Sequence, residues 1–366
     1  MKNKNIILTS TVAIVVLCLS VFCWFKPHKA YSEGERRLLA EKPELTVETV
    51  LSGEYMKDFE QYATDQFPFR ESFRTVKAIF ADYILNKKDN NGLFVADGHI
   101  SKIEYPVNPD MVDNAEEKFD YLYENYMKDT NVNIYLSVVP DKNYFIAEKN
   151  GYVSIDYKQF AEDFAKRMDY MKYIDILPLL SLDNYYKTDS HWKQEEIIHI
   201  AEYLAESMGQ EMTAEYKVNS LENQFKGVYL GQSALPFEPD TIKYLTNDVL
   251  DKCTVKYYDT GMAVKGDVYN MEKAVGKDPY EMFLSGTSPL IEIENNMADT
   301  EKELVIFRDS FGSSLAPLFV PAYSKITIVD IRYIQSGFVG NYVKFNNQDV
   351  LFIYSTTLLN NSTALR

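Results

Sequence analysis

The sequence predicts an α/β protein in which helices flank a parallel sheet, preceded by a helical attachment and a membrane anchor. Three observations predict this class. Beyond residue 90, apolar runs typical of buried strands alternate with amphipathic helices. Residues 31–90 show helical periodicity, and an uncharged apolar stretch precedes them. The 366 residues, 46% of them hydrophobic, are enough to bury a substantial core.

The chain opens with an uncharged stretch from Ile6 to Phe25, which lies between Lys4 and Lys26. A stretch of this length crosses a bilayer as one helix. A cleaved signal peptide ends in small residues, whereas the letters "VFCWFK" end this stretch with bulky ones. We therefore expect residues 1–30 to form a retained signal anchor that ties the protein to the cell membrane.

Residues 31–90 are expected to form a polar juxtamembrane segment followed by two helices that break near Phe67–Pro68. In the second helix, Phe73, Val76, Phe80 and Ile84 recur at helical spacing. We expect these helices to pack on the main domain.

Residues 91–366 are expected to form that main α/β domain. It begins with a predicted hairpin, "NGLFVADGHISKI", whose turn is Asp97–Gly98. The helix "NPDMVDNAEEKFDYLYENYMKD", the strand "VNIYLSVVPDKN" and the helix "YKQFAEDFAKRMDYM" follow, in the alternation from which parallel sheets are made. Residues 219–278 are irregular, and their strand-like runs "TIKYLT" and "CTVKYYDT" suggest an insertion. Alternation resumes through "LIEIEN", "ELVIF", "KITIVDI" and "DVLFIYS".

Composition excludes several classes of function. The chain has 38 Lys and Arg against 54 Asp and Glu, a net charge of −16, without a concentrated basic patch, so no nucleic-acid partner is expected. Cys253 is the one thiol outside the apolar segment, which excludes a disulfide within the rest of the chain and a Cys-rich zinc pattern. The 28 Tyr and 21 Phe suit a core and, in part, stacking against sugars.

The stretch "ELVIFRDSFGSSLAPLF" places Ser310 where a buried strand gives way to a helix. Open α/β sheets expose reactive groups at this junction, and the first amides of the helix can face a developing negative charge. Ser310 is therefore a candidate nucleophile. The alternative is that Ser310 only caps the helix, because serine is a favoured N-cap residue.

A serine nucleophile needs a base, and His191 in "YYKTDSHWKQEE" is the candidate among four histidines. Asp189, two residues earlier, can orient the imidazole and stabilise its charged form. The alternative is that Asp189 or Ser190 caps the following helix and that His191 is a satisfied, partly buried residue. His199 lies eight residues away, outside the i, i+4 spacing of a zinc helix, so we expect no metal site, and we assign no cofactor.

Several motifs together resemble the DHHW family of exported bacterial proteins, which is similar to the alginate O-acetyltransferase group. The resemblance covers most of the chain after the anchor: "SEGERRLL", "YATDQFPFRESF", "VVPDKN", "YYKTDSHW", "FLSGTSP", "VIFRDSFGSSLAPLF", "IVDIRYI" and "DVLFIYS". It implies an SGNH hydrolase-like, flavodoxin-like sheet outside the cytoplasm. It also implies Ser310 as nucleophile, His191 as general base and Asp189 as its orienting partner.

The resemblance also implies candidate substrate-binding and oxyanion residues. Gly286 and Thr287 lie in "FLSGTSP", where the related pattern Gly-Gly-Asn has an asparagine in place of Thr287. The backbone amides of Gly286 and Ser310 remain as oxyanion donors. Arg308 stands where SGNH esterases carry glycine, and Lys142 belongs to a Pro-x-Lys turn that suits an anionic or hydroxyl-rich substrate. Trp192 is either a sugar-stacking wall or packing under the loop.

The function expected from these residues is O-acyl transfer, most simply O-acetylation of a cell-surface or secreted polysaccharide through an acyl-serine intermediate. In the resembling systems a multi-spanning membrane acyltransferase delivers the acyl group, and such a partner suits a single anchor. Two alternatives remain. One is a polysaccharide acetyl esterase that uses the same residues with water as acceptor, and the other is a noncatalytic glycan-binding or scaffold protein.

Overall fold

A computed structural model describes residues 2–366, which divide into two compact units. The first unit contains the chain up to Asn91 together with Leu230–Phe237. The second contains Gly92–Tyr229 and Glu238–Arg366. The return of Leu230–Phe237 to the first unit is not visible in the sequence pattern. It is explained by Arg74, whose guanidinium donates to the carbonyl oxygens of Gly231 and Gln232 at 3.0 and 2.9 Å.

The first unit begins with helix α1 (Lys2–Phe25). Its stretch Lys4–Cys23 is long and apolar enough to cross a membrane, with a mean hydropathy of 2.7. By length and composition this helix is either an anchor or a signal sequence.

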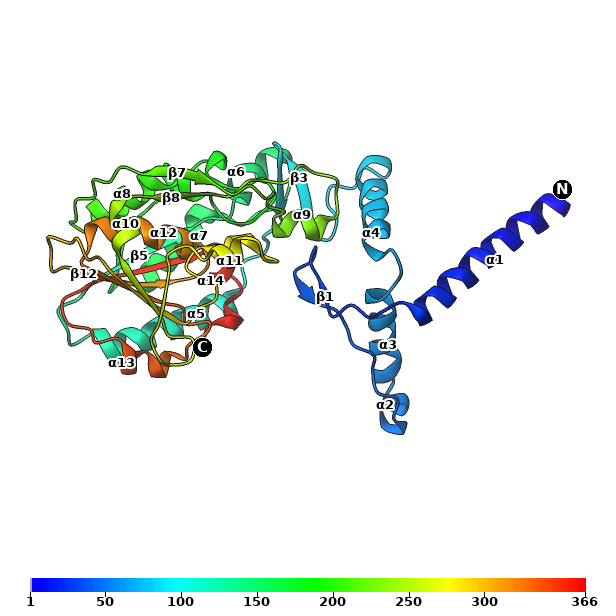
Figure 1. The fold of residues 1–366 in the computed structure, drawn as a ribbon, viewed down its shortest axis with the longest axis horizontal. Helices are drawn as coiled ribbons and strands as arrows, with labels where there is room; N and C mark the ends of the chain where they lie inside the picture. Colours follow the sequence, from blue (N-terminus) through cyan, green and yellow to red (C-terminus); the bar gives the residue numbers. More distant parts are fainter. Residues whose placement is uncertain (1) are drawn as a thin grey trace. The chain divides into compact units, whose positions relative to one another are not determined.

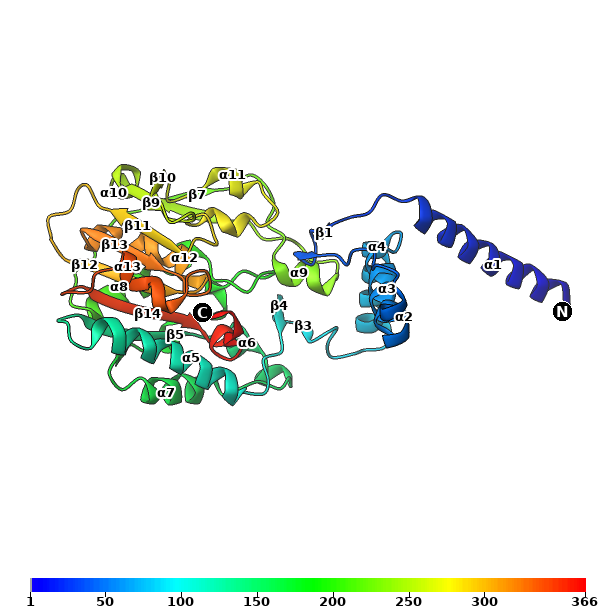
Figure 2. The same cartoon turned by 90° about the horizontal axis from the view of Figure 1, so that it is seen from below.

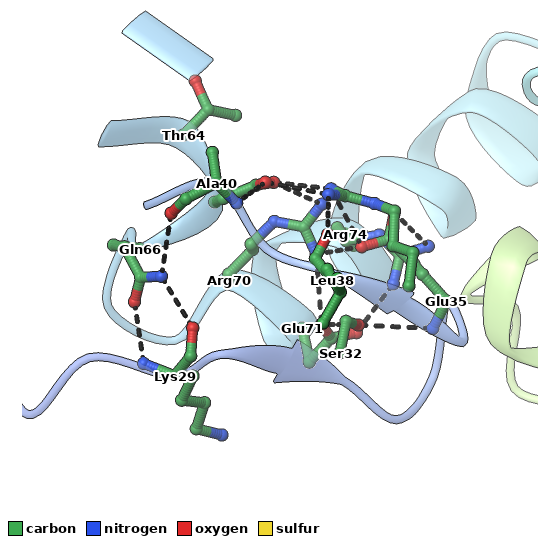
Figure 3. A network of polar contacts seen from close by, with 12 residues as sticks. Lys29, Ser32, Glu35, Leu38, Ala40, Thr64, Gln66, Arg70, Glu71 and Arg74 are labelled. Carbon is green, nitrogen blue, oxygen red and sulfur yellow. Dashed lines mark hydrogen bonds and ion pairs between the residues drawn. The ribbon is translucent and has the colours of Figure 1, made fainter. Parts of the chain in front are cut away.

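The remaining helices of the first unit are α2 (Val47–Ser52), α3 (Glu54–Asp65) and α4 (Arg70–Ile79), which continues as a π-helical turn over Phe80–Ile84. The predicted break near Phe67–Pro68 is confirmed. A network of ion pairs joins α3 and α4 to the segment that carries the short strands β1 (Tyr31–Ser32) and β2 (Arg37–Leu38) (Figure 3). Asp65 accepts from Arg37 at 2.8 Å and from the Ala40 amide at 2.9 Å. The bond from Arg37 lowers the pKa of Asp65 despite its burial.

The second unit is built on an eight-stranded sheet with the order β10-β9-β11-β13-β12-β14-β5-β6. Its strands are β5 (Asn133–Val139), β6 (Lys172–Tyr173), β9 (Thr254–Tyr257), β10 (Val264–Gly266), β11 (Leu290–Glu294), β12 (Glu303–Arg308), β13 (Lys325–Val329) and β14 (Asp349–Ser355). The five strands from β13 to β6 are parallel. The other pairings are antiparallel. The prediction of a parallel sheet is therefore correct for five strands only, and the sheet as a whole is mixed.

The expected insertion over residues 219–278 is wrong in part. Its runs "TIKYLT" and "CTVKYYDT" are strands, but only the first, as β8 (Lys243–Thr246), lies outside the main sheet, paired with β7 (Lys217–Ser220). The second forms β9, which pairs with β11 and extends the main sheet. Val255 and Tyr257 of β9 are buried in the core of this unit, which explains why the strand joins it.

The predicted hairpin is present, and the residues of its turn account for it. Strands β3 (Leu93–Ala96) and β4 (His99–Lys102) pair across Asp97 and Gly98. Both turn residues have positive φ, 48° and 73°, as the tightest hairpin turns require.

Helices cover both faces of the main sheet (Figures 1 and 2). On one face α5 (Pro109–Leu122) and α7 (Tyr157–Arg167) pack against alternate strand residues such as Val305 and Phe307. On the other face α8 (Ile198–Ser207), α12 (Phe311–Leu315) and the 3₁₀ turn after α12 pack against Leu304 and Ile306. This alternation along β12 is the period of a strand buried on both sides.

The parallel strands β12, β14 and β5 are neighbours, and their carboxyl ends therefore meet at one edge of the sheet. The chain leaves β12 at Arg308, β14 at Ser355 and β5 at Val139. In α/β folds this edge is where ligands bind. Ser310 follows β12, whereas Asp189 and His191 lie in the longer segment that follows β6, the edge strand beside β5.

Candidate active site

A chain of hydrogen bonds joins Asp189, His191 and Ser310. The Nδ1 atom of His191 lies 2.6 Å from Oδ1 of Asp189, and its Nε2 atom lies 2.7 Å from Oγ of Ser310. The His191 amide also donates to Oδ1 of Asp189 at 3.1 Å. With Nδ1–H donating to the carboxylate, Nε2 is left as an acceptor for the serine hydroxyl. The loop from Asp189 to His191 thus lies over the end of β12, although 119 residues separate His191 from Ser310.

Burial and stacking fix the orientation of His191. Asp189 is fully buried, and its second oxygen accepts from the Val228 amide at 2.8 Å. The His191 ring is stacked on Tyr280, with centroids 3.9 Å apart and an interplanar angle of 11°. The side chain of His191 keeps 13% of its surface exposed, so a substrate can reach it. Tyr280, which the sequence did not single out, is held in turn by a hydrogen bond to the Ser314 hydroxyl at 2.9 Å.

Ser310 stands at the N-cap position of α12, but its side chain does not cap the helix. The alternative interpretation of Ser310 as a capping residue is therefore wrong. Asp309 supplies the cap, because its Oδ1 accepts from the Phe311 amide at 3.0 Å. Its Oδ2 accepts from the Ser355 amide at 2.8 Å, which ties the ends of β12 and β14 together. Sequence reasoning missed Asp309, although its position directly before the serine was a signal for this role.

Gly286 and Arg308 do not fill the oxyanion and substrate-binding roles expected of them. The Gly286 amide donates to the Phe283 carbonyl at 3.1 Å, so it is occupied. Arg308 is fully buried, and its guanidinium contacts Asp330 at 3.2 Å and the Gly286 carbonyl at 3.1 Å. Arg308 therefore holds the neighbouring loop in place instead of meeting substrate. Thr287, the third residue of this group, is exposed.

The loop that Arg308 holds has an unusual backbone. Leu284, Ser285 and Gly286 have successive positive φ values of 51°, 54° and 71°. Residues other than glycine rarely adopt this region of φ. Each non-glycine residue there destabilises the folded state by about 1–3 kcal/mol, so the surrounding structure has to impose the conformation. The hydrogen bond from Arg308 to the Gly286 carbonyl is one of the contacts that impose it.

Lys142 is also a positioning residue and not the substrate-binding residue expected from the sequence. It is fully buried, and its ammonium group donates to the carbonyls of Tyr186, Lys187 and Asp189 at 2.8, 3.1 and 2.7 Å. All three ammonium hydrogens thus stabilise the loop that leads to His191. Burial lowers the pKa of Lys142 to about 8.

Trp192 is not a sugar-stacking wall, because it is fully buried. Its indole N–H donates to the Phe311 carbonyl and the Ser314 hydroxyl, each at 3.0 Å. The alternative expectation, packing under the loop, is the one observed. Trp192 directly follows His191 in the chain, so these two hydrogen bonds connect the His191 loop with the first turn after Ser310.

A second set of contacts, which sequence reasoning missed, fixes the segment before Asp189. Asp240 accepts from the amides of Lys187 and Thr188 at 3.0 and 2.7 Å. Gly227 packs so closely that an added Cβ atom would lie 2.2 Å from the Thr188 carbonyl oxygen. A single aspartate and a single glycine carry no local pattern that marks these roles.

The described part of the chain contains no group of three or more His, Cys, Asp or Glu residues placed to hold a metal ion. The chemistry available at the site, within residues 2–366, is that of a hydroxyl, an imidazole and a buried carboxylate. Such a set can pass a proton from the hydroxyl to the ring as the oxygen attacks an electrophile.

Comparison with solved structures identifies the fold. The chain matches a DHHW family protein of Eubacterium siraeum with a TM-score of 0.57 and 20% identity, over 75% of this chain and 94% of the other. It matches Bacillus cereus PatB1, solved with a sulfonyl adduct, with a TM-score of 0.55 and 18% identity, over 73% and 97%. The O-acetyltransferase domain of Pseudomonas putida AlgJ matches with a TM-score of 0.43 and 11% identity, over 74% and 92%. No protein-family model and no curated protein matches the sequence.

Proposed function

We propose that this chain, which has the fold of a DHHW family protein, is a membrane-anchored, SGNH-like O-acyltransferase that acts outside the cytoplasm. The observation that carries the proposal is the continuous hydrogen-bonded chain from the buried Asp189 through His191 to Ser310. A serine at the carboxyl end of a strand, hydrogen-bonded to an oriented imidazole, is the arrangement that nucleophilic acyl transfer needs.

The proposed reaction has two halves. Ser310 Oγ attacks the carbonyl carbon of an acyl donor while His191 Nε2 takes its proton, and Asp189 stabilises the imidazolium. The tetrahedral intermediate collapses, the leaving group takes the proton from His191, and acyl-Ser310 forms. An acceptor hydroxyl then gives its proton to His191 and attacks the ester. Collapse of the second intermediate frees Ser310, which recovers the proton from His191.

The Ser310 amide is the proposed oxyanion donor. It donates no hydrogen bond to any group within the described residues 2–366, whereas the Gly286 amide is occupied. A preorganised amide beside the nucleophile stabilises the negative charge on the carbonyl oxygen as it develops.

The proposed acceptor is a cell-surface or secreted polysaccharide, and the proposed donor is an acyl group delivered by a multi-spanning membrane acyltransferase. The motifs shared with the DHHW and alginate O-acetyltransferase groups support this proposal. The apolar helix α1 supports a location at the membrane, beside such a partner. Transfer also requires that the sugar hydroxyl compete successfully with water for acyl-Ser310.

The chemical role of Ser310 is tested with 4-nitrophenyl acetate and a sulfonyl fluoride. We expect the wild-type chain to release nitrophenol and to gain one sulfonyl group, located on Ser310 by peptide mass spectrometry. Both reactions should be lost in Ser310→Ala and kept in Ser220→Ala, which changes an exposed serine. A wild-type chain that neither hydrolyses the ester nor reacts with the sulfonyl fluoride would leave the noncatalytic alternative.

Transfer is distinguished from hydrolysis by adding an oligosaccharide acceptor to the same assay. An acyltransferase forms acetylated oligosaccharide that depends on Ser310. An esterase releases acetate without forming this product, and it also removes acetyl groups from acetylated polysaccharide. The second outcome would replace the transferase proposal with the esterase alternative.

A further inference from the structure

A polar cavity lies in the second unit, at the carboxyl ends of β5 and β14. Its volume is about 210 Å³, and Glu104, Tyr105, Asp141, Tyr229 and Thr357 are among the residues that line it. Pockets for drug-sized ligands start at about 300 Å³, so this cavity suits a smaller group such as one sugar ring. The mechanism proposed above uses none of these residues.

The carboxyl group of Glu104 is only half satisfied. Its Oε2 atom accepts from the Tyr157 hydroxyl at 2.8 Å and from the Thr356 hydroxyl at 3.3 Å. Its Oε1 atom is buried and accepts no hydrogen bond of ordinary geometry from the described residues, although the nearby Thr357 hydroxyl also stabilises the ionised carboxylate. An unpaired buried polar atom is costly and rare in folded proteins, and an atom of this kind at a cavity wall points to a ligand.

Asp141, by contrast, is fully satisfied by the protein. Its Oδ1 accepts from the Asn143 amide at 2.8 Å and the Ser101 hydroxyl at 3.5 Å, and its Oδ2 accepts from the Tyr229 hydroxyl at 3.3 Å. Burial and then the charge of Asp141 raise the pKa of Glu104 to about 7. Near neutral pH, Glu104 therefore exists in both its protonated and its ionised form.

The cavity belongs to the same edge of the sheet as Ser310. Asp141 and Thr356 follow β5 and β14, and Ser310 follows β12, the next strand beyond β14. Two strand spacings correspond to about 10 Å. One sugar ring does not fill both places, but an oligosaccharide can occupy the cavity with one ring and present a hydroxyl of another to Ser310.

We infer that this cavity is a subsite for a hydroxyl-bearing sugar ring of the acceptor, in which a sugar hydroxyl pairs with Oε1 of Glu104 and the ring stacks on Tyr105. The inference rests on the proposed function for its link to Ser310. Tyr105 is 60% exposed beside the cavity and presents an aromatic face.

A hydroxyl suits Glu104 better than an ammonium group does. A hydroxyl donates to an ionised carboxylate and accepts from a protonated one, so it pairs with both forms of Glu104. An ammonium group only donates, so it pairs strongly with the ionised form and only weakly with the carbonyl oxygen of the protonated form.

The test measures binding of neutral trisaccharides to the full-length Ser310→Ala chain in detergent, by saturation-transfer NMR and calorimetry. The probes are cellotriose, maltotriose, mannotriose and triacetylchitotriose, and the chitosan trimer carries free amines. We expect at least one neutral trisaccharide to bind. Glu104→Met should weaken this binding at least about tenfold, the cost of a hydrogen bond to a charged group. Tyr105→Ala, at an exposed position, should weaken it several-fold without unfolding the chain.

Glu117→Met, which changes an exposed glutamate of α5, is the matched control and should bind as the parent does. Failure of every neutral trisaccharide to bind would overturn the inference. So would unchanged binding in both Glu104→Met and Tyr105→Ala, or binding of the chitosan trimer alone. Ester hydrolysis by the wild-type chain is measured separately. Sugar binding without ester hydrolysis would overturn the proposed function but keep the subsite. Ester hydrolysis without sugar binding would overturn the subsite but keep the proposed function.

Discussion

Asp189 contributes at the scale of one residue by holding His191 in a single tautomer. We predict that Asp189→Asn lowers the rate of nitrophenyl acetate hydrolysis by about 10³–10⁴-fold, because the amide can donate to Nδ1 and so favours the wrong tautomer. The thermal transition should stay close to that of the wild type, since the side chain keeps its shape. Asp183→Asn changes an exposed aspartate in the same segment and should be neutral. Equal rates for Asp189→Asn and the wild type would exclude His191 as a base oriented by this carboxylate.

Gly312 is needed for a packing reason next to the nucleophile. An added Cβ atom at Gly312 would lie 2.5 Å from Cβ of Arg308, and the buried arginine has no room to move away. We predict that Gly312→Ala lowers the free energy of unfolding by about 1–3 kcal/mol and reduces ester hydrolysis. Denaturant unfolding measures the first effect. Gly337→Ala, where the nearest atom lies 3.4 Å away, is the control. A fully stable Gly312→Ala would contradict this packing argument.

At the scale of an element, the loop before His191 takes its shape from Lys142. In Lys142→Met the carbonyls of Tyr186, Lys187 and Asp189 lose their shared donor. We predict a loss of about 3 kcal/mol in the free energy of unfolding, because buried carbonyls are left unpaired. We also predict a lower rate of ester hydrolysis, because His191 is no longer held over Ser310.

The matched control is Lys158→Met, whose side chain is 69% exposed and which should change neither quantity. If Lys142→Met were as stable as the wild type but inactive, Lys142 would act on substrate and not on the loop. That outcome would restore the substrate-binding role expected from the sequence.

At the scale of the whole molecule, the enclosed carboxyl group of the partly buried Glu104 couples stability to pH. Its pKa rises from an ordinary value of 4.5 to about 7 in the folded protein, mainly through burial. The folded state therefore binds more protons than the unfolded state between these values. The contribution of Glu104 to the free energy of unfolding is complete below pH 4.5. It falls by on the order of 3 kcal/mol as the pH rises to 7.

Urea unfolding at several pH values checks this coupling. Glu104→Gln has no charge to bury, so the stability of the wild type relative to this variant should fall between pH 5 and about 7. Glu117→Gln should follow the wild type. A constant difference between the wild type and Glu104→Gln across this range would show that Glu104 does not titrate near neutral pH.

Helix α1 is long and apolar enough to cross a membrane. We predict that the full chain sediments with membranes, resists extraction at alkaline pH and keeps its first 30 residues. A variant that lacks residues 1–30 should be soluble. Peptide mass spectrometry of the mature protein checks the prediction, and a soluble wild-type chain that begins after about residue 30 would identify α1 as a cleaved signal sequence.

The sequence by itself determined the elements whose signals are local. The apolar runs of β5, β12 and β14 mark strands buried on both faces, and positive φ at Asp97 and Gly98 follows from the turn residues themselves. The break between α3 and α4 is equally local. Residue type and position at a strand end also singled out Ser310, and Asp189 two residues earlier singled out His191 among the four histidines.

Only the tertiary structure decided strand direction and which polar residues are buried. Strand β9 reads like an isolated strand, but its partner β11 lies more than 30 residues away, and periodicity carries no information about partner or direction. Lys142 and Arg308 resemble solvent-exposed cations in sequence. They are fully buried because carbonyls and a carboxylate from distant segments pair with them, and the energy of burying a charge depends on those partners alone.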